Sequence, residues 1–79
     1  MIRLPRHFFD DHRERLLPTP EVERSTAKHV WVREDAPELP ELLSDARYYA
    51  SEAMYMDPPM PGLASSARAT AKALEEVVR

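Results

Sequence analysis

Prolines limit the length of every regular segment in this chain. The 79-residue sequence contains eight prolines and one glycine, and seven of the prolines fall into three groups, at 18–20, 37–40 and 58–61. A proline inside a helix removes a backbone hydrogen bond, and it disfavours helix in the residue before it. Helices are therefore expected to begin or end near these groups, and the turns between segments should be fixed rather than flexible.

Two long helices are predicted, at 36–54 and 63–78. Asp35 is a candidate N-cap for the first helix, and the second begins just after the only glycine. Each segment carries an apolar stripe at helical spacing. The stripes are Leu39, Leu42, Leu43, Ala46, Tyr49, Ala50 and Ala53, and then Leu63, Ala67, Thr70, Ala71, Leu74, Val77 and Val78. Because a short rigid link joins the two helices, they should pack as an antiparallel hairpin.

A shorter helix is predicted at about 5–15. Pro5 suits its first turn, and Phe9, His12 and Leu16 recur at helical spacing.

The stretch "HVWVR" is rich in β-favouring residues, and "EVER" is a possible partner for it, so 21–33 should form a strand or a small β-hairpin. The sequence thus predicts one small domain over residues 1–79, of the α+β class and mostly α.

Composition narrows the class of protein further. There are no cysteines, which excludes disulfides and thiolate zinc sites. No run approaches the roughly 20 apolar residues of a membrane span, and the N-terminus turns acidic before a signal-peptide core could form. We therefore expect a cytoplasmic protein with no membrane partner. Because so short a chain has a thin core, a homodimer is also expected, through helix faces that carry Ala69, Ala73 and Tyr48.

The stretch "RHFFDDHRER" concentrates histidines and aspartates near the N-terminus. Its possible metal ligands are His7, Asp10, Asp11 and His12. These are few ligands from a single turn or two of one helix, and their spacing matches no established motif. We expect no bound metal and a salt-bridged structural segment, anchored to the rest of the domain by Phe8 or Phe9.

Catalysis has little support in the sequence. The serines stand in contexts unlike a nucleophile elbow, and the single glycine, Gly62, excludes a glycine-rich phosphate loop. A chain of this length is expected to leave little room for a pocket of a few hundred cubic ångströms. We therefore expect no enzyme activity and no cofactor.

Charge is unevenly distributed along the chain. Residues 1–33 carry seven Lys and Arg against five Asp and Glu, whereas residues 34–79 carry four against nine. The basic N-terminal half could bind nucleic acid, but its cations are interleaved with acidic residues and the whole chain has a net charge of −3. Nucleic-acid binding is therefore the alternative to a protein partner.

The predicted strand offers the best-defined candidate contact surface. Successive strand side chains face opposite ways, so Val30 and Val32 share one face, and His29, Trp31 and Arg33 share the other. If the valines face inward, Trp31 and Arg33 are exposed, and both are residue types enriched in binding hot spots. In the other arrangement Trp31 turns inward and packs under the N-terminal helix.

Two tyrosines complete the set of candidate partner-binding residues. Tyr48 and Tyr55 lie at or beyond the edge of the apolar stripe of the first long helix. Aromatic residues are favoured at protein interfaces. They could equally cover the proline-rich link that follows them.

The chain as a whole resembles small proteins of unknown activity that actinobacteriophages encode. The resemblance rests on "LPRHFFDDHRER", "LPTPEV", "HVWVRED", "ELLSDARYYA" and "GLASSARATAKA", in that order. It implies a setting in the cytoplasm of an infected bacterium, and it implies no role for any residue. Together these features predict a non-enzymatic protein-interaction module, a phage-encoded accessory or host-modulating protein whose partner is a host or phage protein.

Overall fold

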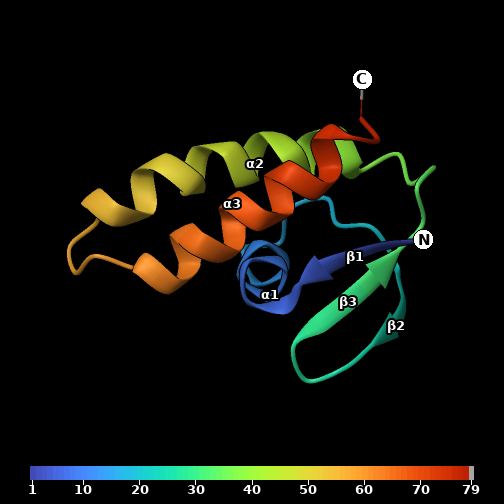
Figure 1. The fold of residues 1–79 in the computed structure, drawn as a ribbon, viewed down its shortest axis with the longest axis horizontal. Coiled ribbons are helices and arrows are strands. Elements are labelled where there is room, and N and C mark those ends of the chain that lie inside the picture. Colours follow the sequence, from blue (N-terminus) through green and yellow to red (C-terminus); the bar gives the residue numbers. More distant parts are fainter. Residues whose placement is uncertain (79) are drawn as a thin grey trace.

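The computed structural model describes residues 1–78 and has the predicted α+β, mostly α fold (Figure 1). Within these residues the domain has three helices, a short 3₁₀ helix and a three-stranded sheet. In chain order they are β1 (Ile2–Pro5), α1 (Arg6–Glu14), β2 (Val22–Ser25), β3 (His29–Val32), α2 (Leu39–Glu52), the 3₁₀ helix η1 (Ala53–Tyr55) and α3 (Pro61–Glu75).

The sheet is antiparallel, with strand order β1-β3-β2. Of the two alternatives predicted at 21–33, a single strand or a small hairpin, the pairing of β2 with β3 shows the hairpin. The first strand was not predicted, and Pro5 ends β1 instead of lying in the first turn of a helix. The reason is that β1 is only four residues long and exists through pairing with β3, for example Ile2 opposite Val32. Such long-range pairing leaves little local signal.

The two long helices form the predicted antiparallel hairpin, which lies across α1 and beside the sheet (Figure 1). Their predicted ends were wrong by a few residues. α2 begins at Leu39 rather than 36, which places Pro40 in the first turn, where its missing N–H leaves no bond unmade. α3 begins at Pro61 for the same reason and ends at Glu75, three residues short of the prediction.

Helix α1 is confirmed to within a residue at each end, but the position expected for Leu16 was wrong. Leu16 lies beyond the helix with φ of 59°, and 93% of its surface is exposed. Its N–H donates to the Arg13 carbonyl, so it terminates α1 in the left-handed conformation. Leucine adopts this conformation at a cost in free energy.

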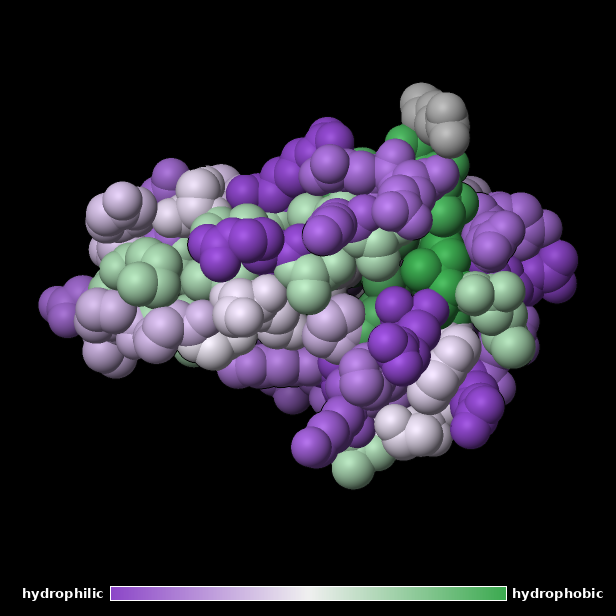
Figure 2. Space-filling model, viewed as in Figure 1, coloured by the Kyte–Doolittle hydropathy of each residue, from purple (hydrophilic) through white to green (hydrophobic). Residues whose placement is uncertain are grey.

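The core lies where the hairpin, α1 and one face of the sheet meet, and α3 contacts β1, α1, α2 and η1. The residues predicted between the long helices are all buried, namely Leu42, Leu43, Ala46, Leu63, Ala67 and Leu74. In Figure 2 the most hydrophobic visible surface lies at the end of the molecule beside the C-terminus, and Val77 and Val78 are half-buried against the core. None of the helices within residues 1–78 has the length and apolar character needed to span a bilayer.

Truncation of a core leucine should unfold much of this small domain. Leu42 and Leu74 have no exposed surface. We expect Leu42→Ala or Leu74→Ala to lower the free energy of unfolding by about 2–5 kcal/mol, because buried apolar area is lost and a cavity remains. Thermal and urea denaturation would measure it. The matched control is Leu16→Ala at the exposed leucine, and an equal loss in the control would contradict the two-helix core.

Replacement of Leu16 by asparagine should stabilise the protein. Asparagine tolerates the left-handed conformation better than leucine, so Leu16→Asn should raise the free energy of unfolding by about 0.5–1 kcal/mol. Leu16→Ala keeps the conformational penalty and should show no such gain. A melting temperature that rises equally in both variants would mean that loss of the exposed leucine, and not the backbone, is responsible.

Candidate functional site

The N-terminal histidine and aspartate cluster is packed against the rest of the domain. Phe8 and Phe9 are fully buried, which confirms the predicted anchoring of this segment. His12 is also fully buried, on the face of α1 that packs inward. Its Nδ1 lies 2.6 Å from an Asp45 carboxylate oxygen on α2, and its Nε2 lies 2.9 Å from the Pro18 carbonyl. Both ring nitrogens of this buried histidine thus have an oxygen atom within hydrogen-bond distance.

Arg15 completes this network just after α1. Its guanidinium donates to both carboxylate oxygens of Asp45, at 3.2 and 2.7 Å, and also to Asp11. The Arg15 guanidinium carbon lies 4.4 Å from the ring centroid of Tyr49. Burial on its own raises the pKa of Asp45, but the hydrogen bonds and charges of Arg15 and His12 outweigh it and lower that pKa below its ordinary value.

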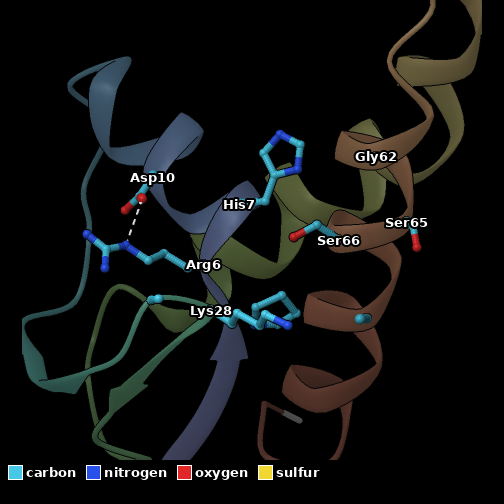
Figure 3. A pocket seen from close by; sticks show the side chains of 10 residues that line it. Arg6, His7, Asp10, Lys28, Gly62, Ser65 and Ser66 are labelled. Carbon is cyan, nitrogen blue, oxygen red and sulfur yellow. Dashed lines mark hydrogen bonds and ion pairs between the residues drawn. The ribbon is translucent and has the colours of Figure 1, made fainter.

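The polar residues of α1 bind each other and α2. Asp10 accepts hydrogen bonds from Arg6 and Arg13, and Asp11 accepts one from Arg15. Within residues 1–78 no group of three or more histidine and carboxylate side chains is arranged to hold a metal ion. His7 points away from this network and lies beside α3 (Figure 3).

The outer face of the sheet holds three of the predicted contact residues. Val30 and Val32 are buried and Trp31 is half-buried on the opposite face, so of the two arrangements left open, the one with Trp31 outside the core is observed. The sheet register places Arg3 and Arg24 on either side of Trp31. The Arg24 guanidinium carbon lies 4.6 Å from the Trp31 ring centroid. Trp31 faces outward because side chains alternate along a strand, so turning Trp31 inward would expose both valines.

His29 and Arg33 extend this surface in opposite directions along β3. The His29 ring centroid lies 6.2 Å from that of Trp31. Arg33 instead donates two hydrogen bonds of 2.9 Å to Asp35, which raise the pKa of Arg33 and lower that of Asp35. The Arg33 charge is thus balanced locally, whereas Arg3 and Arg24 have no carboxylate partner among residues 1–78. We call Arg3, Arg24, His29 and Trp31 the outer sheet face.

The other two candidates lie elsewhere on the molecule. Tyr48 on α2 is 57% exposed and packs edge to face on Tyr49, with ring centroids 5.3 Å apart. Tyr55 in η1 is 84% exposed. Neither α2 nor η1 contacts β2 or β3, so the five predicted residues divide between two surfaces.

An open cleft of about 700 Å³ lies where α1, α3 and the β2–β3 turn meet (Figure 3). The expectation that so short a chain leaves little room for a pocket was wrong, because this cleft is a groove between packed elements and not a cavity in the core. The walls are formed by Pro5, Arg6, His7, Asp10, Ala27, Lys28, Gly62, Ser65, Ser66 and Ala69. A Cβ atom on Gly62 would lie 3.4 Å from His7 Cε1, so glycine leaves room beside that ring.

Comparison with known proteins adds no assignment, since no protein-family model, curated protein or solved structure matches the chain.

Sequence reasoning missed the network around His12 and also the cleft. A histidine on an apolar helical stripe signals a buried partner, but nothing local identifies Asp45, which lies 33 residues away. The walls of the cleft come from segments up to 64 residues apart in the sequence, Pro5 and Ala69 being the extremes.

Removal of the Asp45 charge should destabilise the protein in a pH-dependent way. We expect Asp45→Asn to lower the free energy of unfolding by about 1–3 kcal/mol near neutral pH, because charge-assisted hydrogen bonds from His12 and Arg15 are weakened. The folded pKa of Asp45 lies below its ordinary 3.8. Its contribution is therefore complete above about pH 5 and is lost as the pH falls through the folded value.

Urea denaturation of wild type and Asp45→Asn between pH 7 and pH 2 would test this pH dependence. The stability difference should be constant near neutrality and shrink in acid. Asp57→Asn, at an exposed aspartate in the link between α2 and α3, is the matched control and should show little difference at any pH. A difference between wild type and Asp45→Asn that grows as the pH falls would contradict the network.

Proposed function

We propose that this protein is a non-enzymatic interaction module that binds a macromolecular partner through the outer sheet face. The observation that carries the proposal is the position of Trp31, which is outside a small core and between two arginines without carboxylate partners among residues 1–78. Tryptophan and arginine are the residue types most enriched among interface hot spots. The arginines favour an acidic partner surface.

The setting proposed for this interaction is the cytoplasm of a phage-infected bacterium, on the resemblance to actinobacteriophage proteins described above. The partner would then be a host or phage protein. Tyr48 and Tyr55 offer a second, separate surface for a further contact. The homodimer expected from the thin core stays a prediction, and sedimentation at tens of micromolar would distinguish it from a 9.1 kDa monomer.

Substitution of Trp31 should abolish partner capture without unfolding the domain. Because Trp31 lies outside the core but is still half-buried, Trp31→Ala should cost about 1–3 kcal/mol, below the 3–5 kcal/mol typical of a core tryptophan. Immobilised wild type should retain a protein from bacterial lysate that Trp31→Ala does not retain. Tyr55→Ala, on the other surface, is the control and should still retain it. A folded Trp31→Ala protein that captures the same partner would show that the proposed surface is wrong.

Nucleic acid is the second candidate for the same surface, and the row Arg3, Trp31, Arg24 is the observation that favours it. A base can stack on a partly exposed aromatic ring while arginines contact adjacent phosphates. Trp31 is the only tryptophan, so its fluorescence reports on this face alone. In a titration with single-stranded oligonucleotide, two phosphate contacts would give a slope of about −1.4 for log affinity against log salt. Capture from lysate that is lost after nuclease treatment would also indicate this alternative.

A further inference from the structure

We infer that the cleft between α1, α3 and the β2–β3 turn binds the phosphate group of a nucleotide-sized small molecule. This site does not involve the outer sheet face, and the inference is independent of the function proposed above. Figure 3 shows His7 and Ser66 at the opening between the two helices with Lys28 below them. Three different segments of the chain therefore bring hydrogen-bond donors to one cleft.

Ser66 supplies the observation that points to an acceptor in the cleft. Ser66 is only 9% exposed, and its hydroxyl oxygen accepts the Phe8 N–H at 2.9 Å. A hydroxyl also has one proton to donate. No acceptor for that proton is found among residues 1–78, whereas the nearby Thr70 hydroxyl does donate, to the Ser66 carbonyl. An oxyanion in the cleft would accept the Ser66 proton.

Charge in the cleft favours an anion. Lys28 makes no ion pair within the described residues, and neither does His7. Asp10 is the only acidic residue of the lining, and its two carboxylate oxygens accept hydrogen bonds from Arg6 and Arg13. In Figure 3 Arg6 turns toward Asp10 and away from the opening, so Lys28 is the main cation that faces a ligand. The N-terminal ends of α1 and α3 add positive potential at the same place.

Hydrogen bonds within the domain hold the walls of the cleft in place. The Phe8 N–H bond to Ser66 holds α1 against α3, and the Arg6 N–H donates to the Lys28 carbonyl at 2.9 Å. The Arg6 side chain also donates to the Thr26 carbonyl, which fixes the β2–β3 turn. Preformed walls reduce the ordering that binding would require.

The volume indicates more than a free ion. About 700 Å³ lies within the range of sites for small organic molecules and exceeds what a phosphate ion fills. Pro5, Ala27 and Ala69 provide apolar wall beside the polar groups. A phosphate ester would match these polar and apolar parts of the lining. Its phosphate would lie at Lys28, His7 and Ser66, and the rest of the molecule would lie against the apolar wall.

An NMR titration of the full chain at constant ionic strength tests the inference. The probes are inorganic phosphate, adenosine monophosphate and, as the uncharged comparison, adenosine. We expect both phosphate-bearing probes to shift the amide signals of His7, Lys28 and Ser66 in a saturable way, with adenosine monophosphate the tighter binder. Absence of saturable shifts, or equal binding of adenosine and adenosine monophosphate, would overturn the inference.

Variants locate the binding within the cleft. Lys28→Gln should weaken phosphate binding about tenfold, because a charge-assisted hydrogen bond is lost. Lys72→Gln makes the same change in net charge outside the cleft and should leave binding within about twofold. Ala69→Leu should block adenosine monophosphate by filling the cleft from an exposed helix position, and Trp31→Ala should have no effect. Equal losses in Lys28→Gln and Lys72→Gln would show a general charge effect and refute the site.

Discussion

The attachment of α1 to the helical hairpin determines where every surface of this protein lies. A helix of nine residues is too short to be stable alone, so α1 depends on tertiary contacts. Two phenylalanines provide the apolar part of this attachment, and two polar contacts fix its geometry. The Phe8 N–H binds the Ser66 hydroxyl on α3, and the His12 ring binds Asp45 on α2. Because β1 runs directly into α1, the same contacts position the sheet.

The polar part of this attachment restricts where α1 can lie. Taking a charged pair out of water has a large desolvation cost, which good hydrogen bonds only offset. His12, Arg15 and Asp45 meet that condition, and no buried side-chain polar atom within residues 1–78 lacks a hydrogen-bond partner. A displaced α1 would leave His12 or Asp45 buried without its partner. The network therefore penalises wrong placements of α1.

The outer sheet face and the cleft both follow from the limited size of the core. A chain of this length cannot bury both sides of a sheet, so the side that carries Val30 and Val32 is buried and the side that carries Trp31 faces outward. The cleft exists because α1, α3 and the β2–β3 turn meet at an angle and small residues such as Gly62 and Ala69 do not fill the space between them. Lys28 and His29 are adjacent in the chain, yet they lie at the cleft and on the outer sheet face, respectively.

The sequence by itself determined the helical hairpin, α1 and the strand β3, because apolar periodicity, β-favouring residues and proline positions act over a few residues. It also determined that Val30 and Trp31 face opposite ways, since strand side chains alternate. Only the tertiary structure decided which side is buried, that β1 adds a third strand, that His12 meets Asp45, and that His7, Lys28 and Ser66 share a cleft. These features join residues far apart in the chain, and such contacts form only when the packing of all the elements brings the residues together.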